Sequence, residues 1–419
     1  MNAICVVIDG LHAGMLGCYG NDWTATPAFD RLACEGFVFD QALIDGPTLA
    51  DFYRAAWQGR HALAPSIENP QALTLPRRLR ETGIATSLWT DEPRLARLPG
   101  CEDFDAVEQL DFELPSGPAE EWDLTVAAQL FAAAADGLPN LRPPFLLWLH
   151  CRGPAGIWDA PLEMRQAFAD EADIAPYAGS EPPHVVLAED HDPDVALSVR
   201  WSYAAEVAVV DRCLEALVAA IAAAGLTDST LSSVQACRGF HLGEHRLIGP
   251  PDASTRLHEE LIHVPWLLRL PNELGPGRSQ ALVQPADLAA TLQDALGLPA
   301  SSASGASVLP LIRGEQETLR DRACLASASE RGLRTAAWYL RWHEAAAAGE
   351  PAPPASDTVY RLFSKPDDRW EVNDVENRLS DLIDPLRRAF DDYRRQLAEP
   401  ATAILLPLDR RLSGAESLE

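Results

Sequence analysis

The sequence has few of the features that mark zinc-binding, membrane-spanning or nucleic-acid-binding proteins. Its eight cysteines are scattered at positions 5, 18, 34, 101, 151, 213, 237 and 324, and no Cys-x-x-Cys pair occurs. That excludes a zinc ribbon and a dithiol redox motif. No apolar run approaches the ~20 residues needed to cross a bilayer. Basic residues are also scarce, since 34 Lys and Arg stand against 62 Asp and Glu, for a net charge of −28. Such a surface repels nucleic acid and anionic membranes, and we expect neither as a partner.

Signals for export are also lacking. The opening MNAICVVIDG has no basic segment, no hydrophobic signal segment and no small-residue cleavage site. Several cysteines lie inside apolar runs, where Cys behaves as a small hydrophobic residue. These features predict a soluble protein of the reducing cytoplasm. They leave the oligomeric state open.

What the sequence does contain is an alternation of apolar strands and helical segments. Strands are expected at residues 3–9, 84–90, 143–151, 231–237 and 261–271, and helices at 26–36, 76–83 and 199–225. Continuous apolar runs of this length are typical of strands that are buried on both faces. The alternation predicts a mainly parallel sheet between helices.

The chain is predicted to form two domains. Residues 1–315 form the large domain, and residues 316–419 form a smaller one with a short antiparallel sheet and a terminal helix at 382–397. An Ala/Pro-rich hinge at 345–357 separates the expected strands of the small domain. Residues 167–197 form an acidic surface insertion. Its alternating Asp190, Asp192 and Asp194 lack the Gly and the closing Glu that a calcium loop needs.

Several stretches resemble segments of the sulfatase family, within the alkaline phosphatase superfamily. They are VVIDGLHAGMLGCYG followed by TPAFDRLACEGFVFDQAL, then RAAWQGRH, STLSSVQACRGFHLGEHRL, RLHEELIHVPWLLRLP and the closing TVYRLFSKPDDRWEVNDVENRL. They cover most of the chain in the family's order. The resemblance implies an α/β fold of the alkaline phosphatase/sulfatase type: a sandwich with a large, mainly parallel sheet between helices, plus a small C-terminal α+β domain.

The resemblance also implies a nucleophile, which this chain lacks. Sulfatases attack sulfate esters with a formylglycine made from the Cys or Ser that opens the signature CxPSR. Ala50 stands at that position, and Phe52 and Tyr53 replace Pro and Ser, while Arg54 is retained. Arg54 either anchors the catalytic turn or has a structural role at the start of a helix. Thr48 and Asp51 are the nearby oxygen nucleophiles that remain.

The metal ligands implied by the resemblance are mostly missing too. The family holds calcium or magnesium with hard oxygen ligands that polarise the ester. Asp9 matches one of these ligands, but Gly10 stands at the second, and Cys237 and Arg238 stand at the later pair. Asp9 and Cys237 are therefore predicted to be vestigial metal positions, and no calcium or magnesium is expected. An Arg238 that points into the old metal pocket would pair with Asp9.

The family's other charged positions have changed as well, and three histidines leave alternatives open. The supporting Lys and His residues of the family correspond here to Asp91, Pro93, Ala155 and Pro250. His150 ends a buried strand, so it either faces the site or lies in the core. The segment His241–His245 matches the zinc-protease pattern H-x-x-E-H, which needs a helix that Gly239 and Gly243 disfavour. A soft-metal site that combines Cys237, His241 or His245, and Asp9 is also chemically sensible.

Two functional hypotheses follow from these residues. The first is a sulfatase-like protein that has lost sulfuric ester hydrolysis and acts in binding or as a scaffold. Its pocket would consist of Arg54, Arg238, His150 and His245 and would hold a small anionic ligand. The alternative is an active hydrolase of sulfate or phosphate esters with a non-standard site. Family likeness favours the alternative, and the missing side chains favour the first hypothesis.

Overall fold

A computed structural model describes residues 1–65, 73–112, 115, 117–169, 174–253, 255–271, 276–299, 304–343, 358–399 and 405–414. The chain divides into two compact units. The first unit comprises residues 1–40, 76–250 and 264–279, and the second comprises residues 41–75, 251–263 and 280–419. The boundary predicted at residue 315 stays a prediction, and the hinge predicted at 345–357 lies outside the described residues.

The main sheet has eight strands, and its central strands are parallel. Its order is β11 (Gly277–Val283), β2 (Phe37–Ala42), β10 (Trp266–Arg269), β7 (Thr230–Arg238), β1 (Asn2–Asp9), β5 (Phe145–Cys151), β3 (Ala85–Thr90) and β4 (Ala106–Gln109). β1 lies between β5 and β7 and runs parallel to both. Every residue of β1 and β5 is buried, as their continuous apolar sequences predict. The carboxyl ends of these strands therefore meet at one edge of the sheet.

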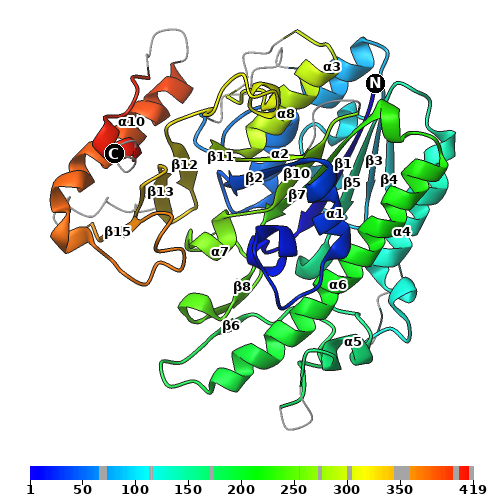
Figure 1. Cartoon of the computed structure of the whole chain (residues 1–419), viewed down its shortest axis with the longest axis horizontal. Helices are drawn as coiled ribbons and strands as arrows, with labels where there is room; N and C mark the ends of the chain where they lie inside the picture. Colours follow the sequence, from blue (N-terminus) through cyan, green and yellow to red (C-terminus); the bar gives the residue numbers. More distant parts are fainter. Residues whose placement is uncertain are drawn as a thin grey trace. The chain divides into compact units, whose positions relative to one another are not determined.

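Helices of the first unit cover this sheet. They are α1 (Pro27–Glu35), α3 (Leu75–Glu81, which begins at the unit boundary), α4 (Val126–Gly137), α5 (Leu162–Gln166) and α6 (Pro193–Ala223). In Figure 1, α6 is the long green helix, with α4 alongside it. α6 begins six residues earlier than predicted, because Asp192 caps it by accepting the N–H of Asp194. The acidic insertion predicted at residues 167–197 therefore ends in the first turn of this helix.

The strand expected at residues 261–271 is only partly correct. Residues 259–262 form the helical turn α7 (Glu259–Ile262), and the strand β10 starts at Trp266. β10 runs antiparallel to both β2 and β7. Pro265, just before the strand, has no N–H to donate to a sheet, which accounts for the late start. A small three-stranded sheet, β6 (Val185–Val186), β9 (Leu247–Gly249) and β8 (His241–Leu242), completes the first unit.

The second unit contains an antiparallel sheet with a helix packed on it. Its strands are β12 (Ala323–Ala326), β13 (Glu330–Arg334), β14 (Trp338–His343) and β15 (Tyr360–Ser364). The predicted terminal helix is α10 (Ile383–Ala398), and its Phe390 ring packs edge-on against Trp342 of β14 at 4.8 Å. The segment 370–377 contains no strand. The unit also contains α2 (Leu49–Gln58), α8 (Pro285–Ala295), α9 (Leu309–Ile312) and α11 (Arg410–Ser413).

No helix among the described residues of the chain is long and apolar enough to cross a membrane.

Candidate functional site

The carboxyl edge of the main sheet brings together four of the predicted site residues. Asp9 ends β1, His150 lies one residue before the end of β5, and Cys237 and Arg238 end β7. Asp9 is paired with Arg238 in the strand register, after an irregularity between Ile8 and Asp9. The order of the neighbouring strands, β7-β1-β5, therefore places these side chains at one point of the edge.

Arg238 holds both carboxylate oxygens of Asp9. Its Nε donates to Oδ1 at 2.6 Å and its Nη2 donates to Oδ2 at 2.8 Å, in a two-point ion pair. The two side chains are only 7% and 1% exposed. Burial by itself would raise the pKa of Asp9, but the charge and hydrogen bonds of Arg238 outweigh burial and lower it. The contact that the sequence suggested between these residues is present, and Asp9 is ionised.

Cys237 also contacts Asp9 but has the wrong charge state for a metal ligand. Its Sγ donates to Asp9 Oδ1 at 3.3 Å. Burial, reinforced by the charge of Asp9, raises the pKa of the Cys237 thiol well above its usual value. Metals bind the thiolate rather than the thiol. Within the described residues of the first unit, no three His, Cys, Asp or Glu side chains converge closely enough to hold an ion. The geometry therefore does not support the soft-metal site.

Gly10, at the position of the family's second acid, has no room for a side chain. Its φ is +74°, a conformation that side chains disfavour. A Cβ built on Gly10 would lie 2.8 Å from the backbone nitrogen of Ala155 and 2.9 Å from the Ala155 Cβ. The turn is further fixed by Tyr203, whose hydroxyl donates to Gly10 O at 2.6 Å and accepts from His12 N at 2.8 Å. A carboxylate at position 10 would displace this packed backbone.

A divalent ion of the kind the sulfatase resemblance implies does not fit this set of groups. Hard cations need six or more oxygen ligands, largely from carboxylates. Here the oxygens of Asp9 already accept hydrogen bonds from a guanidinium, Gly10 offers no side chain, and Cys237 is a neutral thiol. An ion bound at Asp9 would also face the fixed positive charge of Arg238.

His150 lies between this ion pair and a second one that the sequence analysis missed. It is fully buried. Burial, together with the positive charges of Arg238 and Arg94, lowers the pKa of His150 to about 4 against the opposing effects of Asp9 and Glu92. The ring is therefore neutral at pH 7. The second pair joins Arg94 to Glu92 through Nε at 2.8 Å and Nη2 at 2.6 Å.

Arg94 differs from Arg238 in its exposure. Its side chain is 63% exposed, although its carboxylate partner Glu92 is only 2% exposed. The signal in the sequence was the charged tetrapeptide DEPR directly after the strand β3. Asp91 of that tetrapeptide stands where the family has a Lys. Burial raises its pKa to about 7 against the opposing hydrogen bond from the backbone N–H of Arg152.

Ala50 and Arg54 belong to the second unit, and their position relative to Asp9 stays a prediction. Ala50 is the exposed second residue of α2. Thr48 caps this helix, because its hydroxyl oxygen accepts the N–H of Asp51. The Asp51 carboxylate in turn accepts the hydroxyl and the N–H of Thr48, which completes a capping box. Arg54 donates to Asp51 Oδ1 at 3.1 Å and to Ala62 O at 2.9 Å. All three polar side chains therefore stabilise the start of α2, which agrees with the structural role considered for Arg54.

The H-x-x-E-H segment does not form a zinc-protease helix. His241 lies in the strand β8, Gly243 has φ +103°, and His245 has φ +53° in a short 3₁₀ turn. Two histidines can bind one zinc ion in this motif only from the same face of an α-helix. His241 is buried and His245 is half-buried.

Comparison with known proteins identifies the fold and the family. Residues 1–298 match the sulfatase family. The chain belongs to the sulfatase family. Two curated sulfatases match over short stretches: arylsulfatase H of Canis lupus familiaris, 33% identical over 97 residues (23% of this chain, 17% of that protein), and arylsulfatase D of Homo sapiens, 36% identical over 67 residues (16% and 11%). The matched stretches thus span less than a fifth of these relatives.

Solved structures resemble this sulfatase-family chain along nearly its whole length. One is a protein in complex with its substrate D-glucosamine-2-N,6-O-disulfate, with a TM-score of 0.75 and 18% identity, covering 96% of this chain and 99% of that one. Another is a phosphonate monoester hydrolase of Agrobacterium radiobacter, with a TM-score of 0.73 and 17% identity, covering 94% and 96%. At this identity the likeness establishes the predicted α/β fold and says nothing about substrate.

Proposed function

We propose that this chain is a sulfatase-family protein that has lost metal-dependent ester hydrolysis and acts as a binding or scaffold protein. The observation that supports this most directly is the two-point pairing of Asp9 with Arg238. It neutralises the carboxylate that a divalent ion would need and places a cation beside it. An ion that polarises the ester contributes several kcal/mol of transition-state stabilisation. Without it, turnover should be slower by orders of magnitude.

The missing nucleophile supports the same proposal independently. Ala50 has no atom that can attack sulfur or phosphorus. Thr48 and Asp51, the two nearby oxygen nucleophiles, already bind each other in the cap of α2. A group held in this way would have to break the cap before it could react. Only family membership supports the alternative, which is an active hydrolase with a non-standard site.

The ligand class proposed for this protein is a small anion. Arg238 is a poor candidate to bind one, because its guanidinium already holds Asp9 and is almost fully buried. Arg54 likewise donates to Asp51 and Ala62. Arg94 is better placed, since Glu92 fixes its guanidinium while most of the side chain stays exposed. Nucleic acid and membrane remain unexpected as partners, because of the net charge of −28.

The proposal is tested by hydrolysis and by metal binding on the same preparations. Wild type, Asp9→Asn and Ala50→Cys are assayed with 4-nitrophenyl sulfate, 4-nitrophenyl phosphate and a phenylphosphonate ester, with and without calcium or magnesium. The Ala50→Cys protein also carries Phe52→Pro, which restores the Pro of the signature CxPSR, and it is coexpressed with a formylglycine-generating enzyme. We expect no activity above background in any of them, and no saturable calcium heat in calorimetry. Wild-type hydrolysis that Asp9→Asn abolishes would overturn the proposal, as would stoichiometric calcium binding that depends on Asp9.

A further inference from the structure

A pocket between the helices α1 and α6 lies on one face of the main sheet and involves none of the predicted site residues. Its volume is about 190 Å³. In Figure 1, α1 and α6 lie side by side on this face. Ser232 of β7 lines the pocket, whereas Arg238, which holds Asp9, ends the same strand. The step of six residues along β7 corresponds to about 20 Å, so the pocket is separate from the edge with Asp9.

The helix α1 is fixed at both ends, which keeps this pocket open. At its start, Asp211 of α6 accepts the N–H groups of Ala28 and Phe29, each at 3.0 Å. At its end, Gly36 packs against β10, because a Cβ built there would lie 2.8 Å from the carbonyl oxygen of Leu268. These attachments set the distance of α1 from α6 and from the sheet. The pocket therefore exists without a ligand, as is usual for small-molecule sites.

The walls of the pocket are mostly apolar. They come from Pro27, Ala28 and Leu32 of α1 and from Val218, Ile221 and Ala222 of α6. A cavity of about 150 Å³ lined by Leu, Ile and Phe stays dry and binds benzene. A pocket of about 190 Å³ with walls of this kind therefore has room for one ring or a short branched chain.

A cation lies on the sheet side of the pocket. Arg269 of β10 and Ser232 of β7 are opposite each other in the antiparallel register, so their side chains point to the same face, and both line the pocket. Arg269 Nη1 donates to Thr227 O at 3.0 Å, which fixes the guanidinium. A guanidinium has five N–H groups, and that bond uses one of them. The other donors suit a carboxylate, which a guanidinium can bind at two points.

The carboxylates at the pocket are less suited to hold a ligand. Glu35 and Glu215 also line it, and both are exposed. Arg31 already donates to Glu35 at 3.1 Å, and the Glu35 side chain is 45% exposed, compared with 20% for Arg269. Arg269 Nε lies 3.8 Å from Glu35 Oε2, which is beyond hydrogen-bonding distance. Because an exposed ion pair contributes little, a ligand gains more from Arg269 than from either glutamate.

We propose that this pocket binds a small apolar carboxylate of about the size of benzoate. The ring or chain packs against Leu32, Val218 and Ile221, and the carboxylate accepts hydrogen bonds from Arg269. The site lies within the first unit and away from Asp9. Binding there requires neither a metal ion nor hydrolysis, so it stands or falls separately from the proposed loss of activity.

The test is a ligand-observed NMR titration of the full-length protein with benzoate, benzyl alcohol and benzylamine. The three probes share one ring and differ in charge. Benzoate should bind with a dissociation constant of about 1 mM or lower, and about tenfold more tightly than the other two, because only benzoate forms a charge-assisted pair with Arg269. Arg269→Met should weaken benzoate binding about tenfold and leave benzyl alcohol binding unchanged. The absence of saturable benzoate binding, or tighter binding of benzylamine, would overturn the proposal.

A second variant covers the case in which Arg269→Met does not fold. Ala222 is an exposed residue of the pocket wall, so Ala222→Phe should fill the pocket and abolish the binding of benzoate and benzyl alcohol. Ala216→Phe makes the same change at an exposed position of α6 outside the pocket, and it should bind both probes as wild type does. Wild-type affinity for benzoate in Ala222→Phe or in Arg269→Met would mean that benzoate binds elsewhere, and this would overturn the proposal.

Discussion

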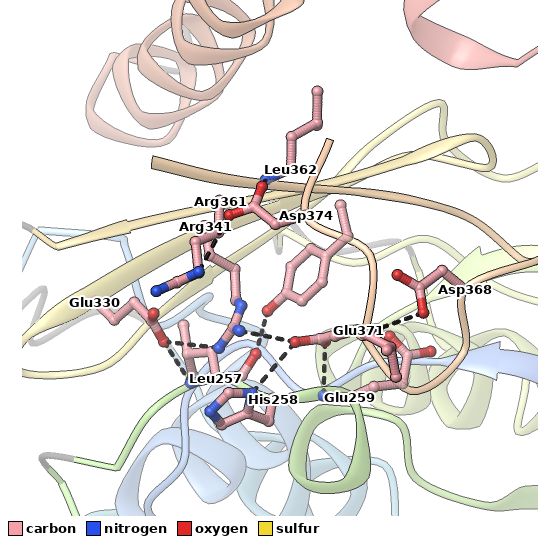
Figure 2. A network of polar contacts seen from close by, with 12 residues as sticks. Leu257, His258, Glu259, Glu330, Arg341, Arg361, Leu362, Asp368, Glu371 and Asp374 are labelled. Carbon is pink, nitrogen blue, oxygen red and sulfur yellow. Dashed lines mark hydrogen bonds and ion pairs between the residues drawn. The ribbon is translucent and has the colours of Figure 1, made fainter. Parts of the chain in front are cut away.

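Two buried acids in this chain, Asp9 and Glu371, respond in opposite ways to the same burial. Asp9 is buried at the end of β1, and Glu371 is buried in the loop after β15 (Figure 2). For each of them, burial alone would raise the pKa. Asp9 has one guanidinium to itself, bound at two points, and its pKa falls. Glu371 shares Arg341 with Glu330 and Lys365 with Glu259, and its pKa rises to about 7. Both acids are buried, so the difference between their pKa values comes from the cations and hydrogen bonds around each carboxyl rather than from depth.

The largest expected effect comes from removing the cation of the balanced pair. Arg238→Met leaves Asp9 buried without its partner, and breaking a buried pair in this way costs about 3–5 kcal/mol. The free energy of unfolding, measured by urea denaturation at pH 7, should fall by that amount. The double variant Asp9→Asn/Arg238→Met is the control and should recover part of the loss, because no unpaired charge remains. Equal stability in the single and double variants would mean that water or another cation compensates Asp9.

Restoring the family's second acid should also destabilise the protein. Gly10→Asp places a side chain at φ +74° and against the backbone of Ala155. Strain at such a position costs about 1–3 kcal/mol and the steric overlap at least about 1 kcal/mol, so we expect a loss of about 2–4 kcal/mol. Thermal unfolding of Gly10→Asp measures this loss, and Gly83→Asp is the control. Gly83 also has positive φ, but nothing lies within 4 Å of the built Cβ, so that control isolates the overlap.

The two acids should have opposite effects on the pH dependence of stability. For Glu371, with a raised pKa, the contribution relative to Glu371→Gln is largest below about pH 4.5 and is lost as pH rises to about 7. At about 1.4 kcal/mol for each pKa unit, the upper bound of that loss is about 3 kcal/mol. For Asp9, with a lowered pKa, the contribution relative to Asp9→Asn is present above about pH 4 and is lost only as pH falls below it. The test is to measure the denaturation midpoints of wild type and both variants from pH 3 to pH 8. If the stability difference from wild type changed with pH in the same direction for both variants, this account would be contradicted.

The smallest effect is expected where the pairing geometry is similar but only one of the two charged side chains is buried. Arg94 binds Glu92 at two points, much as Arg238 binds Asp9, yet the Arg94 side chain is 63% exposed. Because Glu92 is only 2% exposed, Arg94→Met should lower stability at pH 7 by about 1–3 kcal/mol, less than Arg238→Met, since one of the two charges already lies in water. If the loss matched that of Arg238→Met, two-point geometry rather than burial would be the source of the larger effect.

Local patterns in the sequence predicted most of the fold and part of the site. The apolar runs placed β1, β5 and β7, and their parallel arrangement brought Asp9, His150 and Arg238 to one edge. The same reasoning missed the early start of α6, because Asp192, which caps the helix, lies in a segment that was predicted to be a surface insertion.

The remaining features depend on contacts between distant parts of the chain. The clash that bars a side chain at Gly10 comes from Ala155, and the Glu371 carboxyl contacts His258 and the N–H of Glu259, more than a hundred residues away. No periodicity or short motif carries such information, since it depends on how the elements pack. The DEPR tetrapeptide is the exception, because its position after a strand could have identified Glu92 and Arg94.

The close packing at Gly10 also bears on how this chain could change over generations. Under the proposed loss of hydrolysis, a lineage that regained an acid at position 10 would first pass through a less stable protein, because the backbone of Ala155 already fills that volume. A compensating shift of residues 153–155 would have to come before or with the new acid. Recovery of the ancestral site therefore requires coordinated changes in two separate loops, and single substitutions selected one by one would tend to be eliminated before the second arrived.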